Sequence, residues 1–445
     1  MNAVYREARG TLLLAIPIAI GQLSQMLMGI TDSAMIGRTG TVPLAASAFG
    51  AGIFNIFFMI GIGLLTPVAI FASRARGAGR HDEAGEYLRH GLALAVVSGV
   101  VEIGLIVFLG LHLAWFGQPP EVLAAVNPFF MLIGFSLVPV LAYLALRQFA
   151  ESMGRPWVPV LVILAGVVVN AFLNWVLIYG HLGAPRLGLT GAGISTLASR
   201  ILGSAVIFVW LRVDPSMRSA WPRRWFAPLS RERLRRMLAV GLPASGSLLF
   251  EGGAFAAATV MMGWLGAVPL AAHQIAISCA AMTFMVALAL AMAVGMRTSA
   301  AVGAGEHSRL RPIWLGGAAL GATFAVTLTA VFLVFGGTIA SWFIRDPLVI
   351  STATTLLVVA AVFQIFDGNQ VINSSALRAL TDVKVPAAIT FVAYWLIALP
   401  VGYLLGIGLG YGAAGIWSGL AAGLAAAAVM LGLRFLRLTE EGRAH

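Results

Sequence analysis

The sequence predicts an all-α membrane protein with twelve transmembrane helices in two pseudo-symmetric six-helix bundles, and three observations lead to this fold class. The 445 residues are 60% hydrophobic and only 10% charged, with a mean hydropathy of +0.94, whereas soluble domains carry about 25% charged residues. Apolar runs of roughly 18 or more residues, long enough to cross a bilayer, recur along the whole chain. Segments of the first half also reappear in the second half at a nearly constant spacing.

The twelve apolar runs define the expected spans. The first run lacks a short apolar region followed by a small-residue cleavage site, so we expect it to be an uncleaved span and not a signal peptide. No long soluble domain remains between the runs. The expected spans, in chain order, are 11–36, 44–72, 88–112, 122–147, 157–180, 189–212, 236–263, 269–298, 312–337, 350–378, 385–407 and 412–434.

The basic residues alternate sharply between successive loops. Of the 28 Lys and Arg residues, 24 fall on one side, including Arg443 near the C-terminus, and one, Arg200, falls within a span. The other side has only Arg38, Arg186 and Arg345. Because cytoplasmic loops carry the excess of Lys and Arg, both termini are predicted to be cytoplasmic. The net charge of +11 is thereby explained by topology, and no nucleic-acid partner is expected.

Internal repeats indicate that the chain is duplicated. The segment Val-Pro-Leu-Ala-Ala occurs at 42–46 and again at 268–272, which is 226 residues later. At the same spacing, Gly77-Ala-Gly-Arg-His answers Gly303-Ala-Gly-Glu-His. Six spans per half give both halves the same orientation, so we expect an axis of symmetry along the membrane normal and a substrate cleft between the halves near the midplane.

The repeats divide the chain into an N-lobe (1–212) and a C-lobe (236–445). Between them lies 213–235, the only long polar connection, whose prolines and charges are typical of a cytoplasmic linker. Binding of its basic residues to anionic lipid head groups is a second interpretation of this segment.

One face of the first span is polar. Gln22, Gln25, Gly29 and Asp32 follow one another at helical spacing, and Pro17 permits a bend before them. Asp32 is either solvated at the outer interface or a carboxylate that binds an ion or proton.

Two asparagines one turn apart, Asn170 and Asn174, share a face of the fifth span. Their amides could cross-link neighbouring helices by hydrogen bonds. Alternatively, their oxygens complete a cation site with Asp32 and with the hydroxyl of Thr196 from the sixth span. Oxygen ligands of this hard type suit Na⁺.

Two carboxylates lie deep within C-lobe spans. Glu251 is near the middle of the seventh span and Asp367 belongs to a polar arc on the tenth. A charge at that depth costs about 2.5–3.5 kcal/mol on insertion scales, so such residues usually face a cavity, a partner or an ion. Asp367 could be a lone structural hydrogen-bonding group. The alternative is that the two acids share one bound cation, as an antiport switch requires.

Several function classes are excluded by what the sequence lacks. Its glycine-rich segments lack the Lys-Ser/Thr ending of a phosphate-binding loop, and it offers no nucleophile–base constellation, so we expect neither an enzyme nor a cofactor. The one cysteine, Cys279, is expected to be a buried packing thiol, and no Cys/His spacing indicates a structural metal. Glu102 and Arg200 have no assigned role, and each could form a mutual or a local pair or have a function. His273 is assigned to the outer interface.

In combination, these features resemble the multidrug and toxic compound extrusion (MATE) family, within it the NorM-like bacterial branch. The similarity runs from about residue 8 to 435. The residues that carry it are Pro17 with Asp32, the segment Gly37-Arg38-x-Gly40, both Val-Pro-Leu-Ala-Ala segments, Glu251, Phe363-Gln-x-x-Asp367 and Gly180-x-x-Gly-x-Pro-x-Leu-Gly188.

The resemblance implies a function and two sites. It implies a monomer in the bacterial inner membrane that exports amphipathic organic cations in exchange for Na⁺ or H⁺. It implies a C-lobe cation site of Glu251 and Asp367, with Phe284 able to offer a cation–π contact. The N-lobe site would be formed by Asp32, Asn170, Asn174 and Thr196. Asn174 stands where some relatives outside this branch have an aspartate, which favours Na⁺ over a purely proton-driven N-lobe mechanism.

Two other function classes compete with export of cations. A lipid-linked oligosaccharide or lipid flippase could share the two-lobed plan, but it is expected to place basic residues in its cleft, where only Arg200 is a candidate here. A channel or receptor is less consistent with the duplicated lobes.

Overall fold

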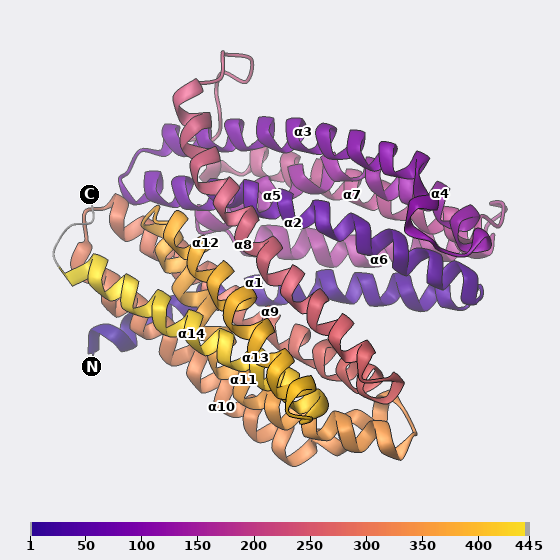
Figure 1. Ribbon diagram of the computed structural model, residues 1–445. Coiled ribbons are helices and arrows are strands. Elements are labelled where there is room, and N and C mark those ends of the chain that lie inside the picture. Colours follow the sequence, from indigo (N-terminus) through magenta and orange to yellow (C-terminus); the bar gives the residue numbers. More distant parts are fainter. Residues whose placement is uncertain (1, 441–445) are drawn as a thin grey trace. The chain divides into compact units, whose positions relative to one another are not determined.

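The computed structural model describes residues 2–440, and the regular elements of this part of the chain are helices throughout (Figure 1). Within these residues, twelve helical segments are long and apolar enough to cross a membrane, as the sequence predicted. Arg443, counted above with the cytoplasmic arginines, lies outside the described residues. The long helices are α1 (Asn2–Gly37), α2 (Thr41–Gly77), α3 (His81–Leu111), α4 (Pro120–Phe135), α5 (Leu137–Ser152), α6 (Trp157–Tyr179), α7 (Gly188–Val213), α8 (Arg231–Trp264), α9 (Ala267–Gly303), α10 (Leu310–Phe343), α11 (Pro347–Ala379) and α14 (Gly412–Glu440).

Two of the twelve spans are interrupted. The fourth span consists of α4 and α5, which are separated at Ser136. The break is explained by Pro139, three residues later, because proline has no N–H to bond the carbonyl one turn back. The eleventh consists of α12 (Lys384–Phe391), the π-helix η4 (Val392–Ala398), α13 (Leu399–Tyr403) and the π-helix η5 (Leu404–Gly408). Pro400 follows η4 and explains the loosened ladder in the same way.

The helices form two compact units whose boundaries cut through α1 and α8. One unit is Ile20–Ser245, and the other joins the residues up to Ala19 to those from Gly246 onward. Both boundaries fall shortly after a proline inside a helix, Pro17 in α1 and Pro243 in α8. We call the first unit the N-unit and the second the C-unit. The lobes expected from the sequence place the whole of the first span in the N-lobe and the whole of the seventh span in the C-lobe. In the structure, the part of α1 up to Ala19 belongs to the C-unit, and the part of α8 up to Ser245 belongs to the N-unit.

The start of α1 belongs to the C-unit because it is tied there by ion pairs and packing. The buried carboxylate of Glu7 accepts hydrogen bonds from Arg309, at 2.9 Å, and from Arg297. Arg297 also donates to Thr11 at 2.7 Å. One turn later Ala15 is part of the hydrophobic core that α9, α11 and α14 share.

The start of α8 belongs to the N-unit for the same kind of reason. The hydroxyl of Ser245 donates to the carbonyl of Ile60 at 2.7 Å. A Cβ on Gly241 would lie 2.7 Å from the carbonyl oxygen of Leu64, so glycine is required for this close approach of α8 to α2.

A row of glycines in α14 allows a similarly close approach to the eleventh span. Gly415, Gly419 and Gly423 recur every four residues and therefore share one face of the helix. A Cβ on Gly415 would lie 2.6 Å from the backbone nitrogen of Gly406. Small residues at this spacing let membrane helices pack backbone to backbone.

Both ends of the described chain lie at one end of the C-unit. Arg309, directly before α10, contacts Glu7 of α1, and Arg311 in the first turn of α10 donates to Thr439 near the end of α14 at 3.2 Å. The two termini are therefore close together, and that they face the cytoplasm remains a prediction.

Candidate functional site

The polar residues predicted for the N-lobe meet inside the N-unit. Asp32 is five residues from the end of α1, while Asn170 and Asn174 are on α6 and Thr196 is on α7. The amide of Asn174 donates to Asp32 at 2.5 Å and to the Oδ1 of Asn170 at 3.2 Å. Thr196 also forms a side-chain hydrogen bond with Asp32. Three helices thus converge on one carboxylate.

Burial makes this N-unit cluster a plausible place for a cation. Asn170 and Asn174 are fully buried, and Asp32 is partly exposed. The Oδ1 of Asn174 has no hydrogen-bond partner within the described part of the chain. A buried unpartnered oxygen beside a carboxylate is what an oxygen-ligated cation such as Na⁺ would use.

Arg200 of α7 adds a positive charge to this cluster, a role that the sequence left unassigned. Arg200 interacts electrostatically with Asp32, and its Nη1 donates to the hydroxyl of Ser136 at 2.5 Å. The guanidinium also lies 4.6 Å from the ring centroid of Phe54. The option of a pairing with Glu102 is wrong, because Glu102 is buried and both of its carboxylate oxygens lack a hydrogen-bond partner among residues 2–440.

The two deep carboxylates of the C-lobe lie within electrostatic range of each other in the C-unit. Glu251 is on α8, and Asp367, which is buried, is on α11. Ala287 on α9 lies close to Gly368, since a Cβ on that glycine would be 3.7 Å from the Cβ of Ala287. Phe284, one turn before Ala287, packs against the core around it. A contact between this ring and a cation stays a prediction.

Two further residues near Glu251 were not predicted from the sequence. Tyr394, which is fully buried in the π-helix η4, interacts electrostatically with both Glu251 and Asp367, and Arg378 at the end of α11 interacts with Glu251. Trp395 fixes η4 against α8 by donating to the carbonyl of Phe250 at 3.0 Å. A tyrosine in an otherwise apolar span was the available signal, because a buried Tyr hydroxyl usually has a polar neighbour.

The rest of the polar arc on α11 cross-links helices. Gln364 donates to Thr283 of α9 at 2.5 Å. Asn373 accepts from Trp314 of α10 at 2.7 Å and donates to the carbonyl of Ala428 at 2.9 Å. Asp367 therefore lies between two anchored turns of α11, which hold its carboxylate in place.

His273, for which the sequence predicts a place at the outer interface, is instead fully buried. Its Nδ1 accepts from the indole of Trp417 at 3.1 Å, and its Nε2 lies 2.9 Å from the hydroxyl of Thr259. This histidine links three helices of the C-unit, and the sequence spacing gave no sign of it. Cys279 is buried, as expected. Among the described residues no group of three or more His, Cys, Asp or Glu could hold a metal.

Comparison with known proteins identifies similar chains. The MatE family model matches residues 17–176 and 243–404. A protein of Rhizobium meliloti named "Probable multidrug resistance protein NorM" is 32% identical over 97% of this chain and 93% of its own length. A protein of the same name from Pseudomonas putida is 36% identical, covering 96% and 94%.

The fold has a close counterpart among solved structures. The Vibrio cholerae MATE transporter VcmN in its bent form matches with a TM-score of 0.89 at 21% identity, over 100% of this chain and 99% of that one. This similarity supports the fold alone. Together with the twelve spans, it confirms the expected all-α membrane architecture.

Proposed function

This chain belongs to the MatE family, and on that premise we propose that it exports amphipathic organic cations from the cell in exchange for inward-moving Na⁺ or H⁺. It is a multi-pass membrane transporter and not an enzyme, and transporters of this family need no cofactor. The polar clusters of the two units bear on the coupling ion and on the kind of substrate.

The single observation that carries the proposal is the electrostatic interaction between Glu251 and Asp367 inside the C-unit. Two carboxylates in a membrane helix bundle repel each other unless a positive charge or a proton is shared between them. A site of this kind is occupied by a cation in one transport state and vacated in another. Tyr394 is a polar group that interacts electrostatically with both acids, and Phe284 is the aromatic ring that would face the cation in this proposal.

The N-unit offers a second cation site of different composition. Asp32 supplies one carboxylate, and the oxygens of Asn170, Asn174 and Thr196 complete a neutral, hard ligand set around it. With one carboxylate and the positive Arg200 nearby, this site would bind a cation more weakly than the C-unit pair does.

Coupling follows if cation and drug favour different conformations. A ligand shifts a conformational equilibrium only by its differential affinity for the two states. Cation entry at the carboxylates would stabilise the state that releases the drug, and cation release would restore the state that binds it. The prolines at the unit boundaries, Pro17 and Pro243, are places where α1 and α8 lack a backbone hydrogen bond and can flex.

The charge of the clusters favours a cationic substrate over a lipid phosphate. Three acids, Asp32, Glu251 and Asp367, stand against the two arginines Arg200 and Arg378. The similar proteins are named for multidrug resistance, and the flippase alternative is accordingly not favoured. We further propose that the protein acts as a monomer in the bacterial inner membrane with both termini cytoplasmic.

The first test is ethidium efflux from a pump-deficient bacterial host. Glu251→Gln and Asp367→Asn should each abolish active efflux, because each removes half of the shared charge. The matched control is Glu440→Gln, which neutralises an acid of the same unit whose side chain is 63% exposed. Wild-type efflux in both site variants would refute the C-unit proposal.

The second test assigns the coupling ion. Purified protein in vesicles is given a Na⁺ gradient and a pH gradient separately, and drug accumulation is followed for each. Dependence on one gradient that Asp32→Asn removes would assign that ion to the N-unit site. Drug movement without either gradient would show that the protein is not a secondary antiporter.

A further inference from the structure

The linker after α7 folds back onto the end of the membrane span that precedes it. The rings of Trp221 and Trp225 lie 5.2 and 5.6 Å from the ring of Phe208, and 5.4 Å from each other. Phe208 is five residues before Val213, where α7 ends. The aromatic cluster is therefore level with the last turns of a transmembrane helix, which is the depth at which Trp gathers in membrane proteins.

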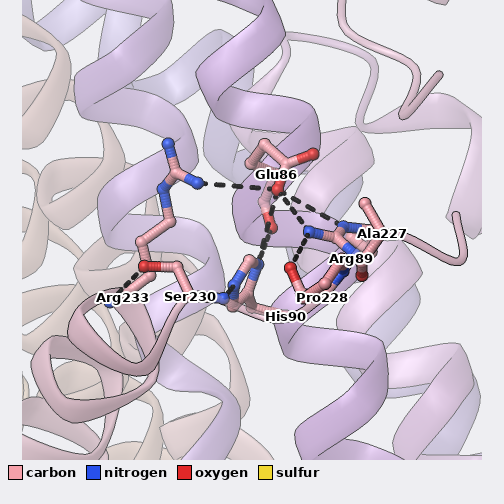
Figure 2. Close-up of polar contacts among 7 residues, drawn as sticks. All are labelled: Glu86, Arg89, His90, Ala227, Pro228, Ser230 and Arg233. Atoms are coloured by element: carbon pink, nitrogen blue, oxygen red, sulfur yellow. Dashed lines mark hydrogen bonds and ion pairs between the residues drawn. The ribbon is translucent and has the colours of Figure 1, made fainter. Parts of the chain in front are cut away.

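The next part of the linker is clamped to α3 by an arginine. Arg89, which is buried, donates to the carbonyls of Ala227 and Pro228, the latter at 3.3 Å, and is itself held by Glu86 at 2.8 Å (Figure 2). A charge-assisted bond to two successive carbonyls fixes the backbone there.

His90, the residue directly after Arg89 on α3, completes the clamp. His90 is fully buried; its Nδ1 lies 2.6 Å from the carbonyl of Glu86, and its Nε2 accepts the backbone N–H of Ser230 at 2.8 Å (Figure 2). The hydroxyl of Ser230 accepts the N–H of Arg233 at 3.3 Å and so caps the start of α8. The linker is thus anchored on both sides of a short exposed stretch, by the ring cluster before it and the clamp after it.

That stretch presents a large apolar side chain on a fixed backbone. Phe226 is fully exposed, and Leu229, within the clamped segment, is 41% exposed. Figure 1 shows the linker looping out beyond α3 at the start of α8. Leaving a Phe side chain in water instead of burying it forfeits about 1.5–3 kcal/mol. Because the clamp holds Phe226 in this exposed position, we infer that its ring enters an apolar environment outside the protein.

The charges around Phe226 identify this environment. Residues 214–231 contain one acid, Asp214, and four arginines. All four arginines are exposed: Arg218, Arg223, Arg224 and Arg231. Among the described residues, only Arg223 has an ion-pair contact, 4.0 Å from Asp82, and both of these side chains are mostly exposed. Exposed arginines around an apolar side chain, level with the end of a membrane span, match an anionic lipid surface better than a soluble acidic partner.

We propose that residues 218–231 form a binding surface for anionic phospholipid, in which the arginines hold the phosphate head groups and Phe226 inserts among the acyl chains. The clamp by Arg89 and His90 sets the depth at which this surface meets the bilayer. The surface would fix the end of α7 and the start of α8 to the leaflet, independently of the transported substrate.

The first test measures lipid preference by native mass spectrometry of the purified full-length protein. Offered equal amounts of phosphatidylglycerol and phosphatidylethanolamine, the wild type should retain phosphatidylglycerol preferentially. The exposed triple variant Arg218→Gln/Arg223→Gln/Arg224→Gln should lower the retained ratio at least about fivefold, since each basic residue near an anionic surface contributes on the order of fivefold in affinity.

The matched control removes three exposed arginines from loops that the sequence predicts on the other membrane face, Arg38→Gln, Arg186→Gln and Arg345→Gln. It should keep the wild-type ratio. An unchanged ratio in the linker variant, or an equal fall in both triple variants, would overturn the proposal.

The second test measures the depth of Phe226. A spin label at Phe226→Cys, in a Cys279→Ser background, is placed in nanodiscs with and without phosphatidylglycerol. The label should collide with oxygen and be shielded from aqueous nickel when phosphatidylglycerol is present, whereas a label at Ser308, which is exposed and lies outside the proposed surface, should remain accessible to nickel. Aqueous exposure of the Phe226 label in both lipids contradicts insertion.

Discussion

A buried ion pair in the N-unit allows a sharp prediction about stability. Arg147 and Glu151, one turn apart on α5, are 5% and 1% exposed, and the Nε of Arg147 lies 2.7 Å from the Oε1 of Glu151. The Nη1 of Arg147 also donates to Gln22 of α1 at 2.8 Å. Gln22 is five residues after Pro17, so this bond ties α1 to the N-unit directly beyond its proline.

The substitution Glu151→Gln removes the charge and keeps the size. Arg147 would then be a buried cation without a carboxylate partner. Apart from residue 151, its side chain hydrogen-bonds only to the Gln22 amide among the described residues. Breaking a buried pair by neutralising one partner costs about 3–5 kcal/mol, because the remaining charge is uncompensated in a region that excludes water. Replacing both residues, as Arg147→Met/Glu151→Leu, should recover most of that loss, since no charge is left buried.

The assay is the unfolding midpoint of purified protein in one detergent, followed by intrinsic fluorescence. The matched control is Glu232→Gln, because Glu232 and Arg236 also pair one turn apart but have side chains 72% and 59% exposed. An exposed pair contributes about 0–1 kcal/mol. We expect the midpoint to fall clearly for Glu151→Gln and hardly for the control. Equal midpoints, or a double variant less stable than the single one, would refute the reasoning.

Three further predictions concern the site and the helix packing. Asn174→Ala removes the donor that lies 2.5 Å from Asp32, so the efflux rate per folded molecule should fall about tenfold, the scale of one hydrogen bond to a charged group. Because Asn174 is fully buried, the unfolding midpoint should fall as well, and an unchanged efflux rate would contradict the role at the site. Arg200→Gln removes the positive charge near Asp32; the concentration of Na⁺ or H⁺ needed for half-maximal efflux should fall, whereas a purely structural role would change only the unfolding midpoint. Gly415→Ala should destabilise the protein by about 1–3 kcal/mol because the new methyl group meets backbone, while Gly203→Ala, with open space beside it, should leave the unfolding midpoint unchanged.

The helices and their polar faces could be predicted because lipid imposes strong local rules. A span in hydrocarbon must satisfy its backbone hydrogen bonds within itself, so long apolar runs become helices regardless of their neighbours. The spacing of Asn170 and Asn174 then places both amides on one face, as the structure has them. The constant spacing of 226 residues between the repeated segments likewise predicts a duplication. The two unit boundaries, at Ile20 and Gly246, are separated by the same 226 residues.

Contacts between distant segments could not be predicted in this way. Helical periodicity shows which side of a helix is polar, but not which faces meet or how deeply each side chain lies. Only the folded chain brings Tyr394 of a π-helix to Glu251, buries His273 between Thr259 and Trp417, and assigns the first turns of α1 to the C-unit. The physical reason is that the sequence sets each helix through interactions within about one turn, whereas the charges near each site depend on packing between residues more than a hundred positions apart.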